Sequence, residues 1–217
     1  MKAMLYKELR LALHPTNLLF LAIGAMLLIP AYPYYAAFIY TCLSVFFLFL
    51  SARENQDTRF TALLPVKKRD AVKGRCGTVA AVELAQLLVA VPFAFLTARI
   101  NPNPAGNPVG IEANAAFFGL VLLLFGLFNV TFLPTFYRTA YKAGRALLFG
   151  GAVVTVYIAA AEFLVQAVPA LQAALDTRDF AFLPARLAVL GAGALAFIVL
   201  TLVSYRVAAK RFESVDL

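Results

Sequence analysis

Few side chains in this sequence have types and spacing that could support chemistry. Glu83 and Glu162 each interrupt a long apolar run, and His14 is the only histidine. Cys42 and Cys76 lack histidine partners, so they do not form a metal site; we expect packing residues rather than a disulfide. No GxxxxGK(S/T) phosphate loop occurs anywhere in the chain. These residues do not form a catalytic constellation, so we expect that the chain is not an enzyme and holds no cofactor of its own.

The elements that must position these residues are long apolar segments. Hydrophobic residues make up 63% of the sequence, and the stretch from Pro15 to Ala52 contains no charge and no histidine. A helix that crosses the ~30 Å hydrocarbon core needs about 20 apolar residues, so this stretch is long enough for two crossings. Pro30 and Pro33 mark the turn between them, and the tyrosines beside these prolines favour the membrane interface.

The whole pattern predicts an all-α integral membrane protein with six transmembrane helices. Closed β-barrels also satisfy the backbone in lipid, but they would show short alternating segments instead of unbroken apolar runs. We therefore expect that residues 1–217 form a single transmembrane domain, with spans near residues 16–32, 34–52, 76–98, 114–136, 146–168 and 184–205.

The charges predict how these spans face. All Lys and Arg residues except Arg99, Arg178 and Arg186 fall in the N-terminal segment, the 53–75 and 137–145 loops, or the C-terminal end. Positive residues stay on the cytoplasmic side, so both termini should be cytoplasmic. The net charge of +8 is explained by orientation and contact with anionic lipid, not by nucleic acid, because the basic residues adjoin apolar spans without an aromatic platform.

Two cytoplasmic segments have a helical apolar pattern. Within residues 1–13, apolar side chains at helical spacing favour an amphipathic interfacial helix over a plain charged lead-in. In the 53–75 loop, Phe60, Leu63 and Leu64 would share one face of a short helix that Pro65 ends. Such an apolar face is expected to be buried, either against the membrane surface or in a groove on a partner protein.

The two glutamates within spans have two readings. A charge at the membrane centre costs on the order of 3 kcal/mol or more, so each glutamate should face protein or water. They could line a path or a dimer interface and contact a cationic or amphipathic cargo. Alternatively, Glu83 forms a structural hydrogen bond near Gln86, and Glu162 reaches the outer interface.

The first cytoplasmic loop carries a family resemblance. The element Leu64-Pro65-Val66-Lys67-Lys68-Arg69-Asp70-Ala71-Val72-Lys73, preceded by Glu54-Asn55-Gln56-Asp57, resembles the small ABC-2-type permeases, the membrane subunits of bacterial ABC exporters. The opening Leu5-Tyr6-Lys7-Glu8-Leu9 is similar as well, and the resemblance covers the whole layout. The sequence departs from the family pattern where Lys67-Lys68 replace the usual Ser before the Arg, and where Lys73-Gly74 replace a Lys and an aromatic residue.

The resemblance implies a permease of the bacterial cytoplasmic membrane that pairs as a homodimer. Each copy would engage a separate ATP-binding subunit, which holds the ATP and Mg, and would export an amphipathic or hydrophobic compound such as a peptide. Residues 60–69 would be the coupling helix, with these contact residues: Phe60, Leu63, Leu64, Pro65, Val66, Lys67, Lys68 and Arg69. The alternative is an ATP-independent secondary transporter or channel, although the two halves of the chain share no repeat with matching broken helices.

Overall fold

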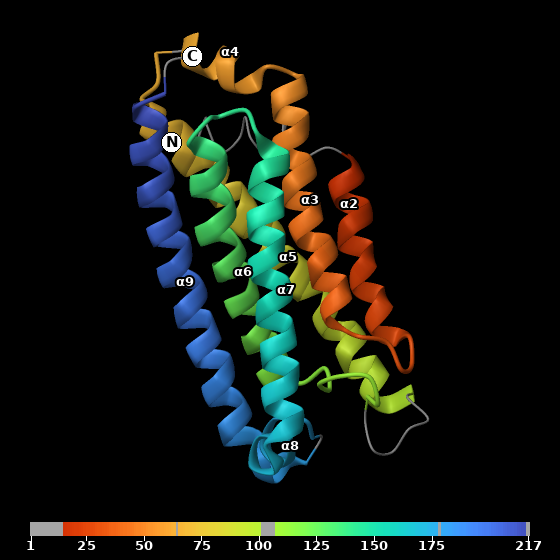
Figure 1. The fold of residues 1–217 in the computed structure, drawn as a ribbon. Helices are drawn as coiled ribbons and strands as arrows, with labels where there is room; N and C mark the ends of the chain where they lie inside the picture. Colours follow the sequence, from red (N-terminus) through yellow and green to blue (C-terminus); the bar gives the residue numbers. More distant parts are fainter. Residues whose placement is uncertain (1–14, 64, 101–106, 178, 216–217) are drawn as a thin grey trace.

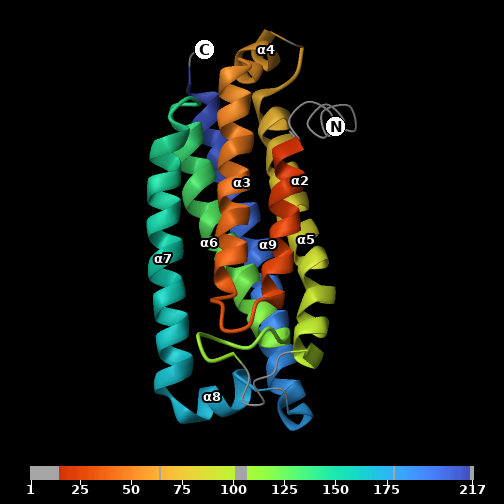
Figure 2. The same cartoon turned by 90° about the vertical axis from the view of Figure 1, so that its right-hand side faces the viewer.

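The computed structural model describes residues 15–63, 65–100, 107–177 and 179–215. Over these residues the chain is helical, with no β-strand, and the long helices run side by side as a bundle (Figures 1 and 2). The elements are α2 (Pro15–Ala22), η2 (Ile23–Leu28), α3 (Tyr35–Glu54), α4 (Asp57–Leu63), α5 (Lys68–Ile100), α6 (Ala115–Tyr137), α7 (Ala143–Ala167), α8 (Pro169–Leu175), η3 (Phe180–Phe182) and α9 (Leu183–Glu213).

Five helical segments are long and apolar enough to cross a membrane. They are α3, α5, α6, α7 and the segment Phe180–Glu213, which joins η3 to α9. These agree with five of the expected spans, although α5 begins at Lys68 instead of near residue 76, so the basic residues before Cys76 form its first turns. The all-helical, multi-pass class is therefore confirmed.

The first expected span is shorter in the structure. Residues 16–32 contain α2 followed by the 3-10 helix η2, which lie beside α3 and α5 (Figure 2). Helices of these lengths rise about 24 Å, less than the ~30 Å hydrocarbon core. Six crossings thus stay a prediction. The expected amphipathic helix at residues 1–13 and His14 lie outside the described residues.

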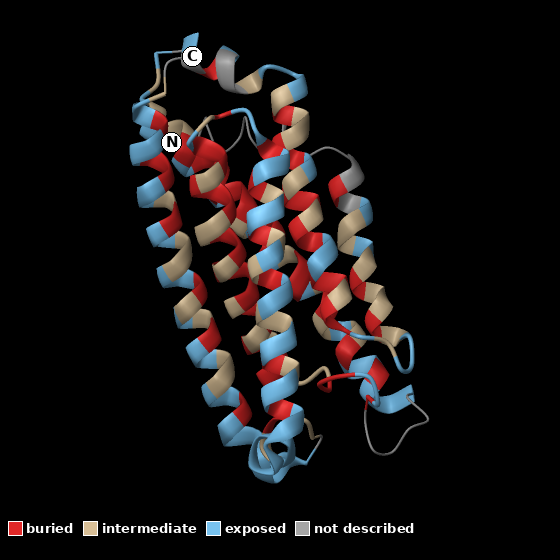
Figure 3. Ribbon diagram, in the orientation of Figure 1, coloured by how far each residue is buried: buried red, intermediate tan, exposed pale blue. Residues whose placement is uncertain are grey.

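The core lies around α6. In its most apolar stretch 67% of the residues are buried, a larger share than in any other candidate span. Phe117, Phe125, Phe128 and Phe132 are fully buried on this helix, and the buried faces of its neighbours turn inward toward it (Figure 3). The ring of Phe49 on α3 lies 5.2 Å from the Phe132 ring, centroid to centroid. Close packing of aromatic rings thus holds α3 against α6.

The tyrosines at the turn after η2 are buried. Tyr34 and Tyr35 are 2% and 3% exposed, so their rings lie inside the bundle. The Tyr35 ring packs 4.8 Å from the Phe117 ring. The aromatic surface of α6 thus covers these rings, and their place at the membrane interface stays a prediction.

The closest helix crossing joins α6 to α9. A Cβ atom added to Gly193 would overlap the carbonyl oxygen of Gly119, and one added to Gly119 would lie 2.5 Å from the carbonyl oxygen of Val189. Neither position can therefore hold a side chain without moving a backbone. Small residues let membrane helices approach in this way.

Candidate functional site

The first candidate site is the short helix α4 at the end of the bundle where α3 finishes and α5 begins (Figure 1). Gln56, with φ of 51°, forms the turn between α3 and α4. Phe60 and Leu63 are 55% and 81% exposed, so two large apolar side chains face away from the bundle. Leu64 lies outside the described residues. Exposed apolar groups on so short a helix are suited to burial against another surface.

The expected coupling helix at residues 60–69 is divided in the structure. The helix α4 ends at Leu63, Pro65 and Val66 lie in the connecting turn, and α5 starts at Lys68. The proline explains the break, since it disfavours a helical conformation in the residue before it. Two separate helices therefore share the residues that the resemblance assigned to one.

Arg75 fixes α4 to the rest of the bundle. Its guanidinium donates to the Asp57 carboxylate at the start of α4, with a 2.5 Å distance between the N and O atoms. The same guanidinium lies 5.6 Å from the centre of the Phe49 ring on α3. The Arg75 side chain is nearly buried, so this ion pair is less screened by water than a surface pair. One side chain of α5 thus joins α3 and α4.

The three cations of the expected coupling element have different surroundings. Lys67 is exposed. Lys68 Nζ donates to the carbonyl oxygen of Val215 at 2.6 Å, and Arg69 forms an ion pair with Glu213 at 2.5 Å. Two of the three cations therefore hold the C-terminal end of α9 against the start of α5.

The second candidate site is a polar network between α5, α6 and α9. Glu83 has no exposed surface and accepts a 2.8 Å hydrogen bond from Asn129 Nδ2. Asn129 also donates to Thr201 Oγ1 at 3.3 Å, and Ser204 Oγ donates to the Asn129 carbonyl at 2.6 Å. Gln86 is not part of this network. Its amide fits between Phe20 O and Gly24 N, at 3.2 and 3.1 Å.

Glu162 belongs to a different network, at the end of the bundle distant from α4. It is half-buried and accepts a 3.4 Å hydrogen bond from the backbone N–H of Ile111. The adjoining loop is held further by Asp176, which accepts from the N–H of Glu112 at 2.8 Å, and by Asn114, which donates to Leu175 O at 2.6 Å. Among the described residues the structure does not bring the two glutamates together. A role for either in a translocation path stays a prediction.

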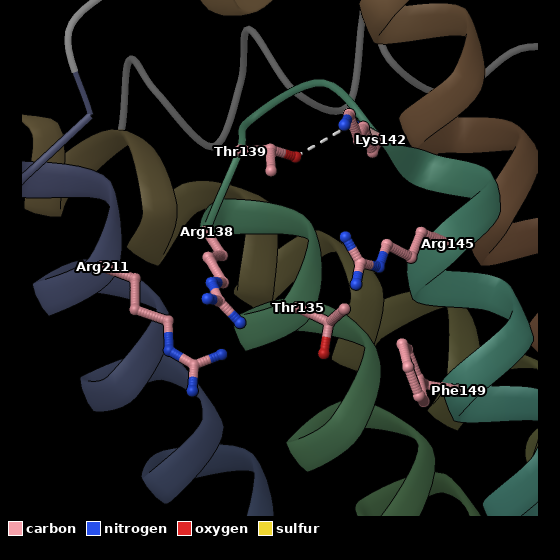
Figure 4. Close-up of a pocket in the computed structure, with 7 residues that line it drawn as sticks. All are labelled: Thr135, Arg138, Thr139, Lys142, Arg145, Phe149 and Arg211. Carbon is pink, nitrogen blue, oxygen red and sulfur yellow. Dashed lines mark hydrogen bonds between the residues drawn. The ribbon is translucent and has the colours of Figure 1, made fainter.

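A third feature was missed from the sequence: a cavity of about 480 Å³ at the same end of the bundle as α4. Four cationic side chains line it, and Figure 4 shows them as sticks. They come from the 137–145 segment and from α9, whose charges we had interpreted only as signals of orientation. The available signal was that these segments hold several cations with few acids nearby in the sequence.

The family model for ABC-2 family transporter proteins matches residues 3–213 of the chain. No curated protein and no solved structure matched. The match covers nearly the whole chain, so this protein belongs to the ABC-2 transporter family. It is a multi-pass membrane component, and membership implies partnership with an ATP-binding subunit.

Proposed function

We propose, from membership of this family, that the chain is the membrane-spanning subunit of an ABC exporter in a bacterial cytoplasmic membrane. It moves an amphipathic or hydrophobic compound, such as a peptide, out of the cell. The ATP and Mg are bound by a separate subunit, and hydrolysis there supplies the energy. Two copies of the chain form the permease, with their termini in the cytoplasm.

The exposed apolar pair on α4 carries this proposal. Fully burying a side chain such as Phe or Leu contributes about 1.5–3 kcal/mol, so Phe60 and Leu63 offer a large gain to a partner with a matching groove. A helix docking in a groove is a recurrent mode of recognition. Lys67 is exposed next to this pair, where it suits an acidic rim.

The anchoring of α4 suits it to transmit movement. Arg75 ties Asp57 to α5 and lies over Phe49 of α3, so a displacement of α4 acts on two long helices at once. A groove that grips Phe60 and Leu63 would therefore pull on the bundle. This is the mechanical link that an ATPase in a separate chain needs.

The first experiment is a co-purification with the ATP-binding subunit encoded beside this chain. We expect the unchanged chain to retain that subunit, and the double variant Phe60→Ser/Leu63→Ser to recover at least about tenfold less, because the variant loses the apolar contacts. The matched control is Phe180→Ser, which removes an 81% exposed phenylalanine from the opposite end of the bundle. That variant should retain the ATPase.

Two results would contradict the proposal in different ways. Equal recovery with the double variant would place α4 on the membrane surface instead of in a groove. Failure of any ATPase to bind the unchanged chain would favour the ATP-independent secondary transporter or channel.

A further inference from the structure

The cavity at the α4 end of the bundle is lined by a cluster of cations from two parts of the chain. Arg138, Lys142 and Arg145 come from the end of α6 and the start of α7, and Arg211 comes from α9. In Figure 4 the guanidinium groups of the three arginines point toward the space around the Thr135 hydroxyl. The cavity of about 480 Å³ thus concentrates positive charge with hydroxyl groups, a combination that suits a phosphate.

These charges have no acidic counterpart in the described part of the chain. The ion pairs there join Arg53 to Glu54, Arg69 to Glu213 and Arg75 to Asp57, and none includes a cation of the cavity. Arg211 donates to the carbonyl oxygen of Pro134 at 2.8 Å, which leaves its charge uncompensated. Like charges gathered in one concave site repel each other and attract an anion from outside.

An apolar cavity of about 330 Å³ adjoins the cationic one. The two share Thr135, Phe149 and Arg211, and the second extends along Val130, Val153 and Val207. Each valine lies one helical turn deeper in the bundle than Pro134, Phe149 or Arg211 on the same helix. A polar compartment therefore opens directly into an apolar one, along three helices that would stand in the membrane.

We propose that these joined cavities bind an anionic phospholipid from the adjoining leaflet. The phosphate headgroup occupies the space among Arg138, Arg145 and Arg211, and the first part of an acyl chain follows the apolar cavity past Phe149 and Val153. A free phosphate would use only the first compartment, and an acidic protein would have no use for the second. This site is separate from α4 and does not depend on the coupling proposed above.

The test measures lipid binding by the purified full-length chain in detergent. The probes are dioleoylphosphatidylglycerol and, as the comparison without net charge, dioleoylphosphatidylcholine. Native mass spectrometry measures how much of each lipid binds. We expect selective binding of the anionic lipid, and binding about 30-fold weaker in Arg138→Gln/Arg145→Gln, since each basic residue contributes about one kcal/mol near anionic lipid. The matched control Arg206→Gln/Lys210→Gln removes two exposed cations from the same end of α9, outside the cavity, and should bind as the unchanged chain does.

A second variant separates a lipid from a free anion. Val153→Phe fills the apolar cavity and leaves all four cations in place. We expect Val153→Phe to weaken phosphatidylglycerol binding. Inorganic phosphate should displace the lipid only weakly from every variant. The thermal midpoint of each variant checks that it is folded.

Five outcomes would overturn the proposal. Phosphatidylglycerol could bind the cavity variant and the unchanged chain equally, or the α9 control could lose binding to the same extent, which would indicate general surface charge. Inorganic phosphate could displace the lipid at equal concentration, or Val153→Phe could bind normally, which would indicate a free-anion site. Loss of the ATPase with lipid binding retained in Arg138→Gln/Arg145→Gln would instead make the cavity a protein interface.

Discussion

Glu83 is a carboxyl group without exposed surface on a helix that would lie in the membrane. Removing a carboxyl from water is costly unless hydrogen bonds replace the lost hydration. Asn129 supplies the one hydrogen bond found for it, and Glu83 Oε1 and Asn129 Oδ1 have none among the described residues. Glu83 therefore depends on Asn129 for its polar contact inside the bundle, whereas Asn129 also donates to Thr201 Oγ1.

This dependence predicts the outcome of a double-mutant cycle with Glu83→Leu and Asn129→Leu. We expect Asn129→Leu alone to lower the free energy of unfolding by about 1–3 kcal/mol, because it leaves the buried carboxyl unpaired. The double variant should lose less than the sum of the two single variants, with a coupling energy of about 0.6–1.7 kcal/mol.

The free energies would be measured by thermal or denaturant unfolding in detergent. Glu83→Gln is the conservative control, since its amide can still bond Asn129, and should keep most of the stability. A coupling energy of zero would mean that the hydrogen bond does not stabilise the bundle.

At the residue scale the sequence predicted which positions are unusual but not what they contact. Glu83 stands out because it interrupts an apolar run, yet its expected neighbour Gln86 faces α2 and η2 instead. Residues three apart on a helix share one side only approximately, and each turns to the nearest polar partner on another helix. That partner, Asn129, is distant in sequence, and span residues that are apolar on every side do not indicate which helices meet.

At the scale of the elements, the α6–α9 crossing is the feature that tolerates least change. The backbones touch at Gly119 and Gly193, whereas Gly191 on the same helix has open space around it. Tight crossings in membranes depend on such small residues, because no hydrophobic effect drives the helices together in lipid.

We therefore expect opposite results from two glycine substitutions in α9. Gly193→Ala should destabilise the protein by about 1–3 kcal/mol or more, because the new methyl group forces the two helices apart. Gly191→Ala should be neutral or slightly stabilising, since alanine favours a helix more than glycine does. The thermal midpoints of unfolding in detergent compare the stabilities of the two variants. Equal midpoints would contradict the close crossing.

The elements themselves were largely predictable, and their exact ends were not. Five of the expected spans appear as helices because length without charge is a direct requirement of the membrane. The start of α5 was placed too late because the basic residues before Cys76 looked like a loop, although Lys and Arg are good helix formers. The division of residues 60–69 follows from Pro65, which the apolar pattern predicted as the end of the short helix, whereas the family resemblance assigned these residues to one helix.

At the scale of the whole molecule, the start of α5 and the end of α9 are in contact at one end of the bundle. The contacts of Lys68 with Val215 and of Arg69 with Glu213 place the C-terminal end beside the start of α5, at the end where α4 lies. The turn after η2 and the loop near Val109 lie at the other end (Figure 1). The positive residues gather at the first end, so we expect this end to face the cytoplasm.

Labelling of single introduced cysteines with a membrane-impermeant reagent tests this orientation. Lys67→Cys should react only in permeabilised cells and Val109→Cys in intact cells, while the lipid-facing control Leu195→Cys should react in neither, since its side chain is 64% exposed on a span. The native Cys42 and Cys76 are buried and should stay silent.

The same cells test the number of crossings. A peptide tag at the N-terminus should be reached only after permeabilisation if residues 16–32 cross the membrane. A tag accessible in intact cells would reduce the crossings to five, and labelling of Lys67→Cys in intact cells would reverse the orientation.

The glycine contact between α6 and α9 also limits how the molecule can change shape. The two backbones are in contact at Gly119 and Gly193, and hydrogen bonds from Ser204 to the Asn129 carbonyl and from Arg211 to the Pro134 carbonyl join the same helices further along. We therefore expect α6 and α9 to move together and Arg138 and Arg211 to keep their separation. Arg145 and Phe149, on the other side of the cationic cavity, belong to α7. The distance between positions 138 and 145 therefore reports where α7 lies relative to α6 and α9 at each stage of a transport cycle.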